Sequence, residues 1–206
     1  ELLPALVAHQ TGELKNLEDP QSLFDNENPK GELSVGAKYA ISSDVTVEGA
    51  INPDFSQIEA DAAQILVNST ISFLYPERRP FFQEGSDIFR TLFNSFYTRT
   101  VNDPAFTAKL TSRHGRTRLG VLSAYDENSP YIIPLDASNI FLNGDKSLVN
   151  VVRGSQQFGD NSQIGFMLTD RRYDGGGSGS IISLDGSFRL SRSNTFVGQY
   201  IMSHTA

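Results

Sequence analysis

The chain of 206 residues carries a formal net charge of −7 and contains no cysteine. The acidic balance argues against nonspecific nucleic-acid binding, which needs clustered Lys and Arg to neutralise phosphates. The lack of cysteine excludes disulfides, thiolate metal sites and a Cys nucleophile, and no run of about 18 apolar residues predicts a transmembrane helix.

Alternation of apolar and polar residues predicts a series of about eight to ten antiparallel strands. In chain order the predicted strands are Leu2–Thr11, Val35–Ile41, Val45–Asn52, Phe106–Arg113, Arg116–Tyr125, Leu148–Phe158, Gln163–Arg171, Ile181–Leu190 and Thr195–Ser203. Several of them reach about 9–12 residues, whereas strands of globular sheets are usually about 5–6 residues long. A tilted strand that spans a membrane needs about 9–11 residues.

The two faces of these strands differ in polarity, which predicts that one face contacts lipid and the other water. The predicted lipid-facing set is Ile164, Phe166, Leu168, Ile182, Leu184, Phe188 and Leu190. The predicted lumen-facing set is Gln163, Thr169, Arg171, Ser183, Asp185, Ser187 and Arg189.

The connections between the later strands alternate in length. His114-Gly115, Gly159–Ser162 and Ser191–Asn194 are tight, whereas Asp126–Ser147 and Tyr173–Ser180 are longer. Outer-membrane barrels have short periplasmic turns and longer extracellular loops. We therefore expect an all-β protein, an antiparallel up-and-down β-barrel of the outer-membrane type, with a soluble β-sandwich or barrel as the alternative. Both ends of the chain fall inside strand-like runs, so we expect an incomplete barrel from a longer protein.

Residues 56–102 interrupt this pattern, because they are charge-rich and poorly periodic. Asn68–Tyr75 could form a strand, which the prolines of Pro76–Pro80 would end. Ser86–Phe93 is expected to form a short helix with Ser86 as its N-cap. We interpret residues 1–206 as one partial barrel domain that contains residues 56–102 as an insertion or plug-like loop.

The insertion and the residues before it hold a cluster of acidic and basic side chains: Asp54, Glu59, Asp61, Glu77, Arg78, Arg79, Glu84 and Asp87. The two arginines can form bidentate pairs with carboxylates and so fix the insertion inside a lumen. Ca²⁺ would also accept several carboxylate oxygens, although the spacing matches no EF-hand loop. A pair of carboxylates could serve a glycosidase if the two lay about 5–9.5 Å apart. We expect ion pairs rather than a metal or cofactor site.

Other chemical motifs are weak. His9, His114 and His204 are far apart and form no zinc-binding pattern. Aromatic residues near the predicted strand ends suit the membrane interface or, alternatively, stacking on a sugar ring. These residues are Tyr39, Phe55, Tyr97, Tyr125, Phe158, Tyr173 and Tyr200.

Two segments are similar to a known family. Asn52–Asp61 reads NPDFSQIEAD, and Phe73–Gly85 reads FLYPERRPFFQEG and is followed by Asp87-Ile88-Phe89. Both resemble the signature of the domain of unknown function 5916 family, whose members lie downstream of family 9 carbohydrate-binding modules in secreted proteins of Gram-negative bacteria. The resemblance implies an outer-membrane barrel-like region and a sugar-related role for the whole protein, but it carries over no catalytic residue.

Three functions follow as hypotheses. The first is a non-enzymatic segment of an outer-membrane barrel in a Gram-negative bacterium, with membrane lipid as its partner and a saccharide or similar solute as its ligand. The second is a carbohydrate-active hydrolase that uses carboxylates of residues 54–87. The third is a soluble β-domain that binds glycans.

Overall fold

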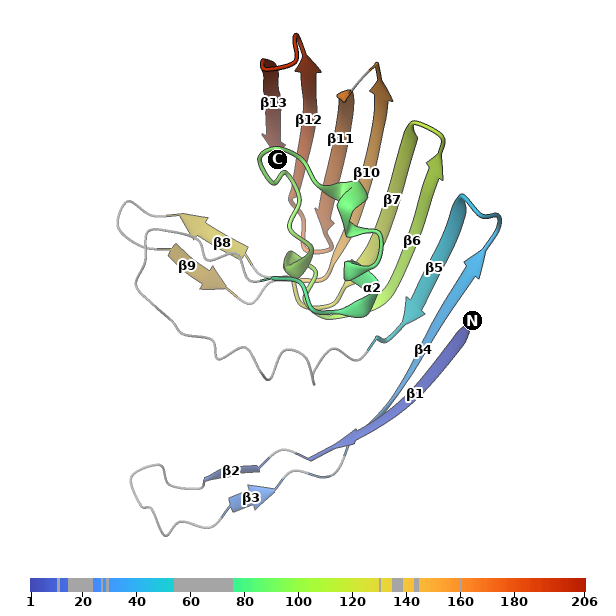
Figure 1. Cartoon of the computed structure of the whole chain (residues 1–206). Helices are drawn as coiled ribbons and strands as arrows, with labels where there is room; N and C mark the ends of the chain where they lie inside the picture. The colour runs from blue at the N-terminus through green and yellow to red at the C-terminus, as the bar shows by residue number, and fades with distance from the viewer. Residues whose placement is uncertain are drawn as a thin grey trace.

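The computed structural model of the chain describes residues 1–10, 12–14, 24–26, 28, 30–53, 76–129, 131–134, 139–142, 145–159 and 161–206. One antiparallel sheet of nine strands dominates it, in the order β1-β4-β5-β6-β7-β10-β11-β12-β13 (Figure 1). The strands are β1 (Leu2–His9), β4 (Lys30–Ala40), β5 (Val45–Ile51), β6 (Pro104–His114), β7 (Thr117–Asp126), β10 (Ser147–Phe158), β11 (Ser162–Tyr173), β12 (Ser178–Arg189) and β13 (Thr195–Thr205). This confirms the predicted all-β, up-and-down fold. Among the described strands the sheet is open, with β1 and β13 as its edges.

Smaller elements lie in the connections. Two short hairpins, β2 (Gly12–Leu14) with β3 (Phe24–Asn26) and β8 (Tyr131–Pro134) with β9 (Asn139–Leu142), form sheets of their own. The insertion contains the one-turn helix α2 (Pro80–Gln83) and the 3-10 helices η1 (Ser86–Phe89) and η2 (Thr98–Thr100).

The helix predicted at Ser86–Phe93 is shorter than expected and begins differently. Only η1 forms, and its N-cap is Gly85 with φ 68°, so Ser86 is the first helical residue instead of the cap. Glycine adopts this left-handed conformation without steric cost, which lets the chain turn one residue earlier. The strand predicted at residues 68–75 lies outside the described residues.

The connections at the two ends of the sheet differ in length. Residues 41–44, 115–116, 159–161 and 190–194 connect strands at one end, and residues 10–29, 52–103 and 127–146 connect them at the other. The predicted longer loop at Tyr173–Ser180 is wrong, because β11 and β12 extend into it and leave only residues 174–177 between them. One end of the sheet therefore carries only tight turns.

Each tight turn is offset from the previous one along the strand direction by a constant amount. Four pairs close them: Ile41–Val45, His114–Thr117, Phe158–Ser162 and Leu190–Asn194. The strand register gives the offset between successive turns: Val45 lies opposite Ser112, and the next closing pair begins two residues later, at His114. The later pairs are offset by the same two residues, and because successive pairs are two strands apart, the stagger is one residue per strand. With a rise of about 3.3 Å per residue and about 4.8 Å between strands, this stagger corresponds to a strand tilt of about 35°. Closed barrels whose shear equals their strand number have a tilt of about 36°.

The sheet has two faces of opposite character. We call the face that contacts the insertion the inner face and the opposite one the outer face. Large apolar side chains on the outer face are exposed, among them Ile164 (51%), Leu184 (51%) and Met202 (50%). On the inner face, Lys109 is 3% exposed and Arg153 is 2% exposed.

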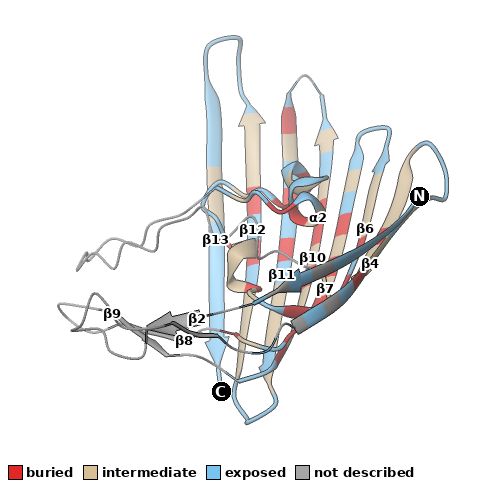
Figure 2. Cartoon of the chain, turned by 90° about the horizontal axis from the view of Figure 1, so that it is seen from below, coloured by how far each residue is buried: buried red, intermediate tan, exposed pale blue. Residues whose placement is uncertain are grey.

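The apolar core lies between the inner face and the insertion (Figure 2). Phe82, Ile88 and Phe89 of the insertion form one buried cluster with residues of the central strands, such as Leu122 and Val151. Gly120 of β7 leaves room for this contact, because a Cβ atom there would collide with the side chains of Ile88 and Phe89. The described part of the insertion is thus packed into the sheet's concave side.

Candidate functional site

Arg79 is the main anchor within the insertion. It is 2% exposed, and its Nε and Nη2 atoms donate to the two carboxylate oxygens of Glu77, each at 2.8 Å. Its Nη1 donates to the carbonyl of Val101 at 2.6 Å. Burial alone raises the pKa of the Glu77 carboxyl, but hydrogen bonds from Arg79 and Thr98 outweigh burial and hold that pKa below its usual value. The guanidinium therefore ties both ends of the described insertion together.

Lys109 connects the insertion to the sheet. This residue of β6 pairs across the strands with Glu48 of β5, and its ammonium lies 3.0 Å from the Glu48 carboxylate. The same ammonium donates to the carbonyl of Phe81 and, at 2.7 Å, to the carbonyl of Glu84. Because the three donors of an ammonium all find acceptors, this buried cation holds α2 against β5 and β6.

The structure places the predicted acidic and basic cluster in three separate pairs. Glu77 pairs with Arg79, Glu84 pairs with Lys38 of β4, and Asp87 accepts two hydrogen bonds from Arg113 of β6, at 2.9 and 2.7 Å. Arg78 is exposed, and its side chain pairs with no carboxylate among the residues that the structure describes. Asp54, Glu59 and Asp61 lie outside the described residues.

Two further contacts bind the insertion to the later strands. Arg171 of β11 donates to the carbonyl and hydroxyl oxygens of Thr100, at 2.9 and 3.0 Å. Gln199 of β13 accepts from the backbone N–H of Phe93 at 2.5 Å and donates to the Phe93 carbonyl at 3.1 Å. Together with Lys38, Lys109 and Arg113, these contacts hold the insertion from β4 to β13.

A buried pair that the sequence analysis did not single out lies on the inner face. Arg153 of β10 donates two hydrogen bonds to Asp185 of β12, at 2.6 and 2.8 Å. Asp185 was predicted to face the lumen, but its partner was not predicted, because the contact depends on the register of three strands. The sequence signal was an arginine in the apolar run Leu148–Phe158.

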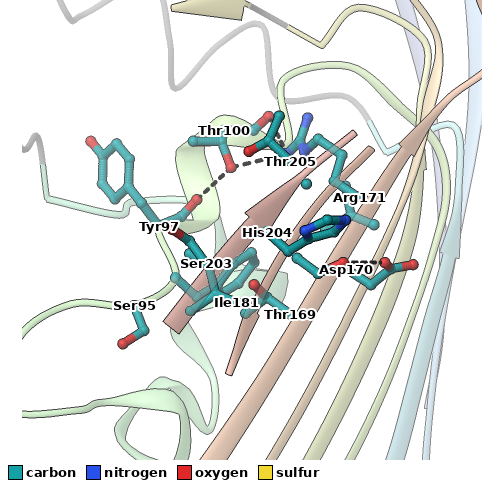
Figure 3. Close-up of a pocket in the computed structure, with 14 residues that line it drawn as sticks. Ser95, Tyr97, Thr100, Thr169, Asp170, Arg171, Ile181, Ser203, His204 and Thr205 are labelled. Carbon is teal, nitrogen blue, oxygen red and sulfur yellow. Dashed lines mark hydrogen bonds between the residues drawn. The ribbon is translucent and has the colours of Figure 1, made fainter. Parts of the chain in front are cut away.

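A pocket of about 340 Å³ lies between the insertion and the inner face of the later strands (Figure 3). Phe96 and Tyr97 line the pocket from the insertion, and Thr169 and Ser203 line it from β11 and β13. The remaining lining residues are Ser95, Thr100, Val149, Asp170, Arg171, Gly179, Ser180, Ile181, His204 and Thr205. The hydroxyl-bearing residues of this lining and Arg171, which lies on the inner face, suit a small polar ligand.

The predicted interfacial aromatics separate into two groups. Tyr39, Tyr125 and Phe158 lie near strand ends, and Tyr125 stacks on Phe106 with 6.1 Å between ring centroids. Three do not fit the prediction. Tyr97 belongs to the insertion, and Tyr200 lies in the middle of β13. Tyr173 is two residues after Arg171 on β11, so its side chain is on the inner face and not on the face predicted to contact lipid. Phe55 lies outside the described residues. At the tight-turn end, Phe158, Phe188 and Phe196 form a ring cluster that the prediction only partly included.

In the described part of the chain, no group of three or more His, Cys, Asp or Glu residues is placed to hold a metal ion. No helix among the described residues is long and apolar enough to cross a membrane.

Residues 21–117 match the model of a family described as Domain of unknown function (DUF5916). The match supports the predicted family and includes both signature segments. No curated protein matches the chain. Among solved structures, the chain is similar to OmpT, an outer membrane protein of Vibrio cholerae, with 10% identity and a TM-score of 0.34 over 100% of this chain and 76% of that chain.

Proposed function

We propose that this chain, whose residues 21–117 match the domain of unknown function 5916 family, forms a wall segment of a Gram-negative outer-membrane β-barrel. The polarity of the sheet carries the proposal. Its outer face exposes Ile164, Leu184 and Met202, whereas its inner face buries Lys109 and Arg153. A water-soluble domain normally has the reverse distribution, because burying charge costs free energy and exposing contiguous apolar surface promotes association. Strands of outer-membrane barrels are apolar towards lipid and polar towards the lumen.

The stagger of the strands supports closure into a barrel. A tilt of about 35° lies in the range of about 35–45° that membrane barrels adopt. An open sheet of a soluble protein needs no such regular offset of its turns. The tight turns at one end, and the three long connections that lie beside the short turn at residues 174–177 at the other, also match barrels whose short turns face the periplasm.

The insertion is proposed to act as a plug in the lumen of this barrel. It contacts the inner face at Lys38 of β4, Lys109 of β6, Arg171 of β11 and Gln199 of β13. These contacts run along most of the width of the sheet, so the described part of the insertion covers the concave side that would line a channel. Folded plugs of this kind occur in some outer-membrane barrels.

The proposal is tested by a matched pair of substitutions on β12 in the full-length protein. Leu184→Arg places a cation on the outer face, and Ser187→Arg places one on the inner face. In a bilayer the first change costs about 2–4 kcal/mol near the midplane, and we expect it to reduce the folded fraction in outer membranes, measured by heat-modifiable gel migration. Ser187→Arg should assemble like the wild type. Because Leu184 is already 51% exposed, equal assembly of both variants would contradict lipid contact.

We propose a saccharide or similar small solute as the ligand of the pocket beneath the insertion. Thr169 and Ser203 line the pocket, and their hydroxyl groups can exchange hydrogen bonds with a polyhydroxylated ligand. Calorimetric titration of the folded protein with a panel of mono- and disaccharides tests this. Thr169→Val should weaken binding at least several-fold, and Ser187→Ala serves as the control. Absence of binding to the whole panel would refute the saccharide ligand and leave the barrel proposal intact.

We propose a non-enzymatic role for the insertion carboxylates, because each described one already pairs with a cation. Both oxygens of Glu77 accept from Arg79, and Thr98 donates to the same carboxylate at 2.6 Å. Saccharide cleavage by the wild type that is lost in Glu77→Gln and Glu84→Gln would overturn this view.

A further inference from the structure

The outer face changes from apolar to polar at one level of the later strands. Ser180 of β12 donates to Asp170 of β11 at 2.8 Å, and Arg172 donates to the same carboxylate at 3.0 Å. One position nearer the tight turns on the same outer face are Leu168 of β11 and Ile182 of β12, whose side chains are apolar and which are 43% and 41% exposed. A boundary therefore crosses β11 and β12 between these two pairs of positions.

The same level can be followed to β7 by using the strand stagger. Through the register, Tyr125 of β7 aligns with Leu148 and then with Arg172, so Asp170 lies two residues nearer the tight turns than Tyr125 does. β11 lies two strands from β7 in the sheet, so the stagger of one residue per strand offsets their levels by two residues. This offset equals the two-residue difference in register between Tyr125 and Asp170 and cancels it. Tyr125 and Asp170 therefore lie at equal depth along the axis of a closed barrel.

The opposite boundary lies at the tight turns. Their closing pairs, which include Phe158 and Leu190, share one level by the same stagger. Phe158 and Phe188 are ring neighbours there, with centroids 5.9 Å apart. From this level to that of Tyr125 and Asp170 is roughly nine residues, or about 24 Å at a tilt of about 35°. The apolar band of outer-membrane barrels is about 25 Å tall.

We propose that Tyr125, Asp170, Ser180 and Arg172 mark the level at which the outer face leaves hydrocarbon and meets phosphate-bearing lipid headgroups, on the side of the long connections. This inference rests on the proposed function and adds where the bilayer lies. The Tyr125 hydroxyl points away from the apolar band towards Asp174, to which it donates at 2.5 Å, and such amphipathic rings favour the headgroup level. The side chain of Arg172 is 74% exposed beyond the band, where a guanidinium can bind a phosphate.

Depth measurements with spin labels test the boundary, and the absence of cysteine makes single labelling sites simple to create. We would label Phe166→Cys, near the middle of the band, and Arg172→Cys, beyond its edge, in full-length protein reconstituted into phosphatidylethanolamine–phosphatidylglycerol vesicles. The label at 166 should collide mainly with oxygen, and the label at 172 mainly with a water-soluble nickel chelate. Nickel access at 166 would refute the membrane proposal itself. Oxygen-dominated collisions at both positions would refute only the boundary.

A second measurement tests the phosphate. Thermal unfolding of the wild type should occur at a higher temperature in phosphatidylglycerol vesicles than in vesicles of a neutral galactolipid. Arg172→Gln should reduce this difference in unfolding temperature. Arg189→Gln, which changes the last residue of β12 at the end of the sheet with the tight turns, should leave the difference unchanged. An undiminished difference in Arg172→Gln would show that this residue binds no headgroup phosphate.

Discussion

Arg153 and Asp185 are joined by two hydrogen bonds although a whole strand, β11, lies between them. The guanidinium crosses that strand directly above Gly165, where a Cβ atom would collide with it. Both side chains are almost fully buried, at 2% and 7% exposure. The missing side chain at position 165 is therefore what allows the two charges to meet.

Breaking this pair from one side should destabilise the protein strongly. Asp185→Leu leaves the Arg153 charge buried without a partner, which typically costs about 3–5 kcal/mol. The double variant Arg153→Met/Asp185→Leu should recover most of that loss, because it removes both charges. Urea unfolding in detergent micelles measures both free energies. A double variant no more stable than Asp185→Leu alone would show that the pair is not the source of the effect.

Gly165→Ala should disturb the same contact without removing either charge. The new methyl group would occupy the space of the Arg153 guanidinium, and overpacking of this kind costs about 1–3 kcal/mol. Gly179→Ala is the matched control, since no heavy atom lies within 4 Å of a Cβ built on this β12 glycine. We expect the control to unfold at the wild-type urea concentration or slightly above it. Equal destabilisation by both changes would point to backbone effects instead.

The regular part of this fold is predictable from sequence because its strands are amphipathic over their whole length. The alternation of Ile164, Phe166 and Leu168 with polar residues locates β11, and Ile182 and Leu184 do the same for β12. The short hairpin β8–β9 was not predicted, because strands of four residues give too few alternations to recognise. Helix α2 was also missed, because the segment Pro76–Pro80 was read as the end of a strand, although Pro80 suits the first turn of a helix and is the first residue of α2.

The candidate site was less predictable, because its contacts join residues that are distant in sequence. An arginine–carboxylate pair in the insertion was expected, and Arg79 lies two residues from Glu77. Lys109 and Glu48 are directly opposite each other only through the β5–β6 register, which alternation alone does not fix. Charged residues within amphipathic strands were the available signal, and they indicate the buried face but not the partner.

The hold of Arg79 on the insertion should weaken in acid. Burial acts against the Glu77 carboxylate, but the Arg79 and Thr98 hydrogen bonds prevail and lower its pKa from the usual 4.5 in the folded state. The contribution of this group to stability is therefore complete above pH 4.5 and is lost as the pH falls through the lowered folded-state pKa. The difference in unfolding free energy between wild type and Glu77→Gln should be largest near neutral pH and shrink in acid. A difference that does not change with pH would exclude this linkage.

Gln199 should control how firmly the insertion is held at β13. Its amide pairs with the backbone of Phe93, and its Nε2 also lies within hydrogen-bond distance of the hydroxyl oxygens of Ser95 and Ser183, at 2.9 and 2.8 Å. Gln199→Leu removes these hydrogen bonds, each worth about 0.5–1.5 kcal/mol. Amide hydrogen exchange should therefore accelerate in residues 91–97, while exchange in the central strands β7 and β10 remains slow. Gln199→Glu keeps an acceptor for the Phe93 N–H but loses the donors, so it should give an intermediate rate. If the whole sheet instead exchanged faster in Gln199→Leu, the residue would be stabilising the sheet itself and not a local attachment of the insertion.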